Sequence, residues 1–308
     1  MLRRGLIVVG LLVLVGLVGF LLITAPRKLP ASELAAAYQP NLANGQEMFI
    51  AGNCSACHAA PGQDDRTKLA GGLKLKSPFG TFVTPNITPD PQFGIGGWTE
   101  AQFVNAMKRG TGRHGEHLYP AFPYASYSLM KTADVRDLFA YLKTLPAVAK
   151  PTAPHELNFP FNIRLAVGGW KLLYFHPHEF SPDPKKSAAW NRGEYLAEGP
   201  AHCAECHTPR NALGGEEMAQ LYAGAPNLEK GGRFASNITS NKDGIGDWSE
   251  QDLTDFLKSG TDKCFNEPDG MKDVVASTGK LSEDDVAAIA AYVHALPSLA
   301  GNPKHKTC

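Results

Sequence analysis

A five-residue pattern occurs twice in this chain of 308 residues, as CSACH at 54–58 and CAECH at 203–207. In a C-x-x-C-H pattern both thiols can attach to one haem, and the adjacent histidine can face its iron. Structural zinc would need four ligands at each site, and a dithiol redox motif would not require a histidine in both copies. The sequence therefore predicts two covalently attached c-type haems. The predicted haem-binding residues are Cys54, Cys57, His58, Cys203, Cys206 and His207.

The two motifs belong to a longer internal repeat. Asn-Ile-Thr at 86–88 recurs at 237–239, and Trp-Thr-Glu at 98–100 recurs as Trp-Ser-Glu at 248–250. Each copy holds so few apolar helical positions that a large apolar group must fill its centre. We therefore expect a mainly α fold with two tandem domains of one kind. The expected divisions are a domain over 41–147, a Pro-rich linker over 148–189 and a domain over 190–308.

Helices are expected at matching places in the two copies. One helix leads into each C-x-x-C-H motif (about 43–58 and 190–207), a short amphipathic helix begins at Thr99 or Ser249, and a last helix begins at Thr132 or Ser282. These hydroxyl residues precede apolar residues at helical spacing, which is typical of helix N-termini. The Asn-Ile-Thr triplets match a glycosylation sequon, but their repetition favours a structural turn.

Residues 5–24 are uncharged and long enough to cross a bilayer as a helix, which needs about 20 apolar residues. Arg3 and Arg4 precede this run, so the positive-inside rule favours an N-in, C-out orientation. A cleaved signal peptide is the alternative, but no A-x-A site directly follows the run. We expect residues 1–30 to be a single-pass anchor in the cell inner membrane, with both haem domains in the periplasm. The 30 basic and 30 acidic residues balance, which argues against a nucleic-acid partner.

The second axial ligand of each iron is less clearly marked. Electron-transfer haems often take a methionine there, and Met271 lies between the middle and last helices of the second copy. The matching position of the first copy, within two residues, is Phe122, which cannot bind iron. A bis-histidine haem through His117 or His114, a displaced methionine such as Met130, and an open iron all remain possible.

Neighbouring residues suggest supporting roles. A ligating histidine usually donates its other N–H to a carbonyl, for which Pro61 and Pro209 are candidates. Arg210 could pair with a haem propionate or lie on the surface. Cys264 and Cys308 could form a disulfide in an exported compartment.

Several stretches resemble the cytochrome c subunits of bacterial membrane-bound alcohol and gluconate dehydrogenases. They include TPNITPD (84–90), HLYPAFPY (117–124), WNRGEYLAEG (190–199), HCAECHTPRN (202–211) and LSEDDVAAIAAYV (281–293). The resemblance implies a class I cytochrome c fold in each domain and a dehydrogenase as partner. It also implies that His58, His207 and Met271 are iron ligands. Family members often carry three haems, and Phe122 replaces the usual methionine of L-Y-P-A-M-P-Y.

These observations predict an electron-transfer protein, which takes electrons from a dehydrogenase and delivers them to a quinone, another cytochrome or a terminal oxidase. Haem supplies the redox chemistry and the protein sets its geometry. The alternative is an enzyme whose open first haem reduces peroxide or oxidises a small sulfur compound. Phe122 is the residue that supports this alternative.

Overall fold

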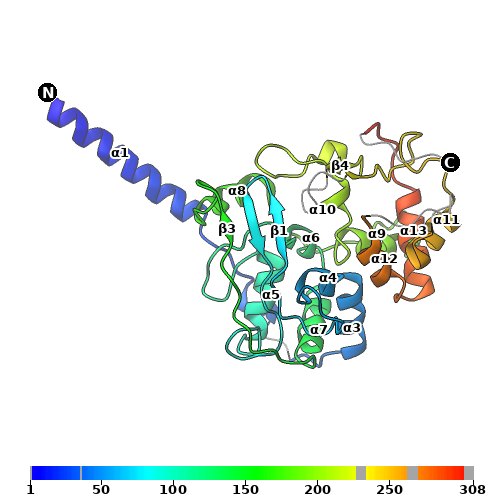
Figure 1. The fold of residues 1–308 in the computed structure, drawn as a ribbon. Helices are drawn as coiled ribbons and strands as arrows, with labels where there is room; N and C mark the ends of the chain where they lie inside the picture. The colour runs from blue at the N-terminus through cyan, green and yellow to red at the C-terminus, as the bar shows by residue number, and fades with distance from the viewer. Residues whose placement is uncertain (1, 35–36, 227–233, 262–269, 302–308) are drawn as a thin grey trace.

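The computed structural model describes residues 2–34, 37–226, 234–261 and 270–301. One helix, α1 (Leu2–Ile23), projects from a body made of two helical parts (Figure 1). The most apolar 18-residue stretch of α1 has a mean hydropathy of 3.2, and none of its residues is buried. By length and composition α1 can therefore cross a membrane, a test that an N-terminal signal sequence also passes.

The first part begins with α3 (Leu42–Ala51) and ends with α7 (Thr132–Leu142), which cross in direct contact. Gly45 permits this crossing, because a Cβ at that position would lie 2.7 Å from the carbonyl carbon of Asp137 and 2.8 Å from Cβ of Tyr141. The other elements of this part are α4 (Cys54–His58), α5 (Glu100–Arg109) and α6 (Tyr124–Tyr127).

The second part repeats the same design. Its first long helix, α9 (Ala188–Glu198), crosses its last, α13 (Glu283–His294). A Cβ on Gly193 would lie 2.5 Å from the carbonyl carbon of Ala288 and 2.9 Å from Cβ of Tyr292. The internal repeat of the sequence is therefore a structural repeat. The other helices of this part are α10 (Ala204–His207), η1 (Met218–Gln220), α11 (Glu250–Ser259) and α12 (Lys272–Thr278).

The continuous helices expected over 43–58 and 190–207 are each broken. Asn53 and His202 adopt left-handed backbone conformations, with φ of 46° and 42°. Each residue immediately precedes the first cysteine of its motif. Because few non-glycine residues adopt this conformation, the break separates the long helix from a short helix that carries the motif, and the expectation of one helix was wrong.

Three of the four expected helix N-termini are confirmed as caps. Thr99 and Ser249 form capping boxes with Gln102 and Asp252, and the Ser282 side chain accepts a bond from the backbone of the first turn of α13. Thr132 is instead the first helical residue of α7 and does not cap it.

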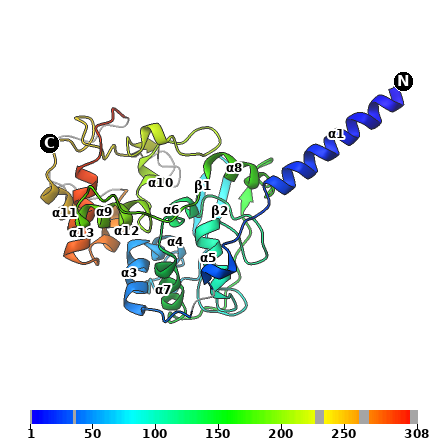
Figure 2. The ribbon, with the colours of Figure 1, turned by 180° about the vertical axis from the view of Figure 1, so that it is seen from behind.

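Short strands also form, although none was expected. β1 (Lys74–Ser77), β2 (Gly80–Val83) and β3 (Glu156–Leu157) make an antiparallel sheet in the order β1-β2-β3. Gly80 pairs with both Ser77 and Leu157. β4 (Ala225–Pro226) pairs with β5 (Phe234–Ala235). Because β3 comes from the linker, the linker runs back over the first part, and α8 (Ala166–Tyr174) lies beside the end of α1 (Figures 1 and 2).

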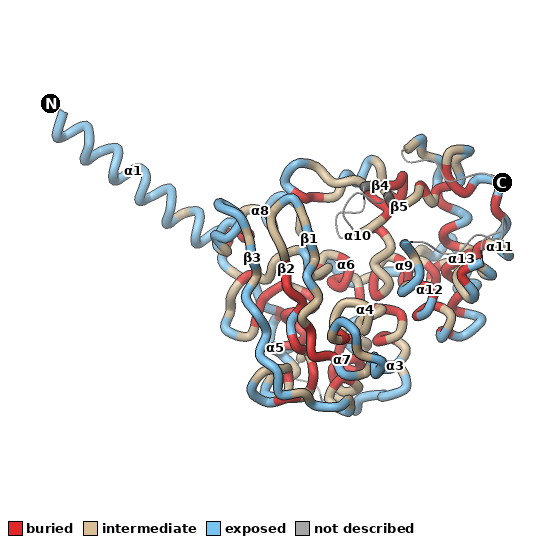
Figure 3. The backbone as a smooth tube through the Cα atoms, in the orientation of Figure 1, coloured by how far each residue is buried: buried red, intermediate tan, exposed pale blue. Residues whose placement is uncertain are grey.

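Buried residues are concentrated inside the two helical parts, whereas no residue of α1 is buried (Figure 3). The two parts are joined by polar contacts between their first helices and the last two helices of the second part. Arg192 of α9 forms ion pairs with Glu47 of α3 and with Asp285 of α13. The hydroxyl of Ser277 on α12 donates to the backbone oxygen of Ile50, 2.6 Å away. These contacts hold the first helix of the first part against the second part.

Candidate haem-binding sites

Each C-x-x-C-H motif lies on its own short helix. α4 holds Cys54 and Cys57 three residues apart, which places them on one face of a helical turn. In the second part Cys203 is the N-cap of α10 and Cys206 lies within it. None of the four cysteines is in a disulfide, and all four are half-buried. Burial raises the pKa of the Cys54 and Cys203 thiols to about 12, so both are neutral at physiological pH.

Both motif histidines are held by a backbone carbonyl. Nδ1 of His58 lies 2.9 Å from the oxygen of Pro85, and Nδ1 of His207 lies 2.7 Å from the oxygen of Ser236. Burial lowers the pKa of both imidazoles, so each is neutral, donates through Nδ1 and leaves Nε2 as a metal ligand. The prediction that Pro61 and Pro209 supply these carbonyls was wrong.

The carbonyls come from loops that return to the motifs, at positions 27 and 29 residues after the two histidines. Gly71 N–H donates to the backbone oxygen of His58 at 2.7 Å, and Gly224 N–H donates to that of His207 at 2.8 Å. A Cβ on Gly71 would lie 2.5 Å from the oxygen of Pro85. Glycine is therefore required where this loop passes the motif.

The Asn-Ile-Thr triplets hold the same loops. Asn86 and Asn237 are 3% and 0% exposed, and each accepts bonds from the backbone N–H and the hydroxyl of the threonine two residues on. Their amide groups donate to backbone oxygens near the domain ends, at Val148 and Leu299. The triplets are thus structural turns, as the repetition predicted, because a buried asparagine side chain cannot accept a glycan.

The donor set fits haem. Each motif offers two thiols that are not in a disulfide, on one turn, and a neutral histidine whose Nδ1 already contacts a carbonyl oxygen. The part of the chain that the structure describes holds no group of three or more His, Cys, Asp or Glu side chains that could bind a metal ion. The zinc alternative therefore has no support in these residues.

The candidate second axial ligands occupy different environments. Met271 is the half-buried N-cap of α12, a helix that the sequence did not predict. Phe122 is also half-buried and packs its ring on Tyr127, with centroids 5.4 Å apart. Met130 is 1% exposed within the core, and His114 lies exposed in a turn. The assignment of Met271 stays a prediction.

His117 lies at the junction of α1 and α8. It is 4% exposed, and a Cβ on Gly168 would lie 2.9 Å from its Nε2 and 2.7 Å from Cβ of Thr24. Within the described residues its imidazole makes no hydrogen bond or ring contact with α4, and its Nδ1 has no partner. This position weakens the prediction that His117 binds the first iron.

The two attachment segments face one another across the domain interface. A Cβ on Gly52 would lie 3.3 Å from Sγ of Cys54 and 3.6 Å from the backbone oxygen of Pro200. The ring of Tyr127 contacts that of His202, which precedes Cys203, with centroids 5.6 Å apart. Sequence reasoning missed this juxtaposition, because residues about 150 positions apart carry no local signal of contact.

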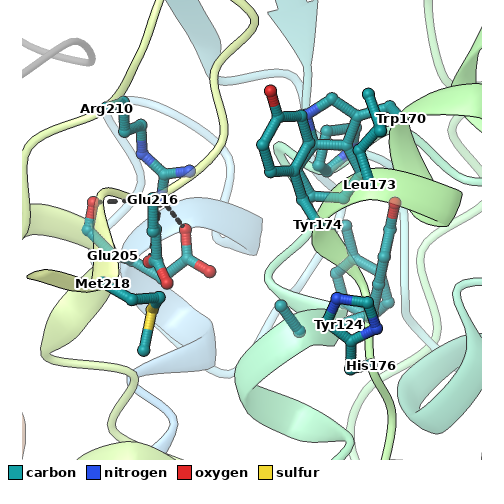
Figure 4. A pocket seen from close by; sticks show the side chains of 12 residues that line it. Tyr124, Trp170, Leu173, Tyr174, His176, Glu205, Arg210, Glu216 and Met218 are labelled. Carbon is teal, nitrogen blue, oxygen red and sulfur yellow. Dashed lines mark hydrogen bonds and ion pairs between the residues drawn. The ribbon is translucent and has the colours of Figure 1, made fainter.

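A cavity of about 150 Å³ lies between the two parts, on the side of α8 (Figure 4). An ionic group stands on one side of it, and aromatic side chains from α6 and α8 stand on the other. The cavity is lined by Pro120, Phe122, Tyr124, Ala125, Trp170, Leu173, Tyr174, His176, Glu205, Arg210, Glu216 and Met218.

The ionic group joins Arg210 to Glu205 within the second motif and to Glu216, whose Oε1 lies 3.3 Å from the guanidinium. All three side chains are less than 20% exposed. Desolvation, aided by the negative charge of Glu205, raises the pKa of Glu216 to about 7. Arg210 is thus not a surface residue, and its charge is balanced by carboxylates of its own chain.

Comparisons with known proteins identify the family of this chain. The cytochrome c family pattern matches residues 42–146. A dihaem c-type cytochrome of Cereibacter sphaeroides is 43% identical over 96% of this chain and 99% of its own length.

Two dehydrogenase subunits are also similar. The cytochrome c subunit of an alcohol dehydrogenase (quinone) of Gluconacetobacter polyoxogenes is 41% identical over 80% of this chain. The cytochrome c subunit of a gluconate 2-dehydrogenase of Pantoea cypripedii is 36% identical over 82%. The chain spans 54% and 58% of these two relatives.

The predicted family and fold are confirmed, as are the two covalently bound c-type haems at Cys54/Cys57 and Cys203/Cys206. Cys264 and Cys308 lie outside the described residues, so their pairing stays a prediction. The chain therefore belongs to the dihaem c-type cytochromes, which are electron-transfer proteins, and it is also similar to the cytochrome c subunits of bacterial dehydrogenases.

Proposed function

We propose that this chain is a membrane-anchored periplasmic electron relay that links a dehydrogenase to an acceptor at the inner membrane. The observation that carries the proposal is the juxtaposition of the two attachment segments, through Gly52 with Pro200 and Tyr127 with His202. A rigid, short separation between two redox centres favours electron transfer within one chain. Haem supplies reversible one-electron chemistry when bound.

The chain's own residues set the conditions for that chemistry. The carbonyls of Pro85 and Ser236 fix the tautomer and ring orientation of the two ligating histidines. The contacts of Arg192 and Ser277 hold the two domains in one arrangement. For the second iron we propose Met271 as the other axial ligand. The proposed domain boundaries are those expected from the sequence, 41–147 and 190–308.

The partners follow from the relatives. Two of them are cytochrome subunits of an alcohol and of a gluconate dehydrogenase, so we assign a dehydrogenase as electron donor. A quinone, another cytochrome or a terminal oxidase would accept the electrons. α1 supports this placement, because it would hold both domains at the membrane, where quinone and oxidase lie.

The anchor and the haems can be tested on the full chain expressed with a cytochrome c maturation system. We expect the protein to stay in membranes after alkaline carbonate extraction and to carry two haems per chain. Cys57→Ala and Cys206→Ala should each leave one haem attached by a single thioether bond. Release of a shortened chain into the soluble periplasm would contradict the anchor and indicate a cleaved signal peptide.

Phe122 favours a second candidate function, in which the first iron has an open position for a small substrate. The location of His117 beside α1 also supports this alternative. Low-temperature EPR of the oxidised protein and carbon monoxide binding to the reduced protein distinguish the electron relay from the enzyme. Two low-spin irons that do not bind carbon monoxide support a pure relay, whereas one high-spin iron that binds it supports an enzyme.

A further inference from the structure

Exposed apolar side chains gather on one small region of the linker. Outside α1, most of the large apolar residues that stand exposed in the described chain fall between residues 159 and 173. Phe159 is 80% exposed, more than any other large apolar side chain beyond α1. The members of this patch, which we call the linker patch, are Phe159, Phe161, Ile163, Leu165, Leu172 and Leu173.

The linker patch is joined to the end of α1. α8 packs on the last turn of α1 through two adjacent glycines, because a Cβ on Gly168 would lie 2.7 Å from Cβ of Thr24 and one on Gly169 would lie 3.3 Å from the ring of Phe20. Both views of the ribbon place α8 at the base of α1 (Figures 1 and 2). The patch therefore lies at the level at which α1 would leave the hydrocarbon core.

The side chains around the patch are those that favour a bilayer surface. Trp170, Leu173 and Tyr174 of α8 line the cavity between the two parts, so the apolar surface that faces the membrane is carried by the other five members of the patch. Arg27 and Lys28 are exposed just after α1 and can reach anionic headgroups. A short helix with an apolar face and basic neighbours commonly lies in the plane of the interface.

We propose that the linker patch inserts into the outer leaflet of the bilayer that α1 crosses, and so forms a second membrane contact. The inference rests on the proposed function, since it requires α1 to be retained as a membrane span. Two contacts stop the first domain from rotating about α1, which gives both domains a fixed orientation to the membrane surface. A dehydrogenase subunit that covers the same patch is the competing occupant.

The test uses the full chain in inner membranes, with the photo-crosslinking amino acid p-benzoylphenylalanine placed at one position at a time. The test positions are Phe159 and Leu165, at 80% and 58% exposure. Leu12 of α1, 56% exposed, reports on the span itself. Leu42, 48% exposed, is the matched control on α3, which lies away from α8 in both ribbon views. All four side chains are exposed, so the changes leave the core intact.

We expect phospholipid adducts, detected by mass spectrometry, at positions 12, 159 and 165, with at least fivefold less at position 42. Lipid adducts at position 12 without lipid at 159 and 165 would overturn the second contact and leave the anchor in place. Protein adducts alone at 159 and 165 would assign the patch to a protein partner instead. Equal lipid labelling at position 42 would also overturn the proposal, and no lipid at position 12 would overturn the anchor itself.

Discussion

Replacing Gly193 by alanine should destabilise the second domain, because α9 and α13 touch at this residue. A Cβ there would lie 2.5 Å from the carbonyl carbon of Ala288 and 2.9 Å from Cβ of Tyr292, well inside the roughly 3.5–4.0 Å at which non-bonded carbon atoms rest. Neither atom can move away by a side-chain rotation, because the carbonyl carbon belongs to the backbone and Cβ is bonded directly to the backbone. The two helices must therefore separate.

Two opposing contributions determine how much the Gly193→Ala change lowers the free energy of unfolding. Alanine is favoured over glycine inside a helix by about 1 kcal/mol. Overpacking a core costs about 1–3 kcal/mol, and here the helices that separate carry the buried Leu196, Val286 and Ile289. With the cost at the upper end, the net loss is about 2 kcal/mol. For a domain of this size that corresponds to a fall in Tm of about 10 °C.

The assay is thermal unfolding of the purified holoprotein, followed by far-UV circular dichroism and by the Soret bands. Gly45→Ala should lower the stability of the first domain for the same reason, because its Cβ would meet Asp137 and Tyr141. Gly169→Ala in α8 is the matched control, since its Cβ would approach only the movable ring of Phe20. A Gly193→Ala protein as stable as the parent, or more stable, would refute the reasoning.

Four further substitutions test other parts of the structure. The pKa of Glu216 is raised from 4.5 to about 7 in the folded chain, so stability should fall as pH rises from 4.5 to 7, by up to about 3 kcal/mol; Glu216→Gln should flatten this dependence in pH-dependent melts. Asn237→Ala should cost about 1–3 kcal/mol in guanidinium unfolding, because it leaves the buried backbone N–H of Thr239 without its acceptor; an unchanged midpoint would contradict that role. Phe122→Met should raise the potential of one haem in a redox titration, and Met271→Ala should lower that of the other; a shift of the same haem in both variants would show that one assignment is wrong.

Local features of the fold were predictable from the sequence. The caps at Ser249 and Ser282 need only the side chain and the first turn of the helix that follows. The attachment residues were equally predictable, because both thiols and the histidine come from one five-residue segment. Because the sequence is repeated, an element predicted in one copy is also predicted in the other.

Features that depend on distant contacts were not predictable. The carbonyls that hold the histidines come from Pro85 and Ser236, 27 and 29 residues after them, and nothing in the sequence marks a carbonyl as a partner. β3 exists only because the linker returns to pair with β2. His117 was predicted as a candidate iron ligand because it lies near Phe122 in the sequence. Its burial against α1 and α8 depends on the packing of three separate segments.

If the two haems form one intramolecular relay, an electron delivered to one haem by photoreduction passes to the other within the same chain. A short flash with a ruthenium photoreductant would inject less than one electron per oxidised full-length protein, and the Soret and α-bands would follow its redistribution between the haems. The facing attachment segments predict a redistribution rate that does not change over a tenfold range of protein concentration. A rate that rises in proportion to protein concentration would show that electrons pass between molecules, and it would contradict the relay.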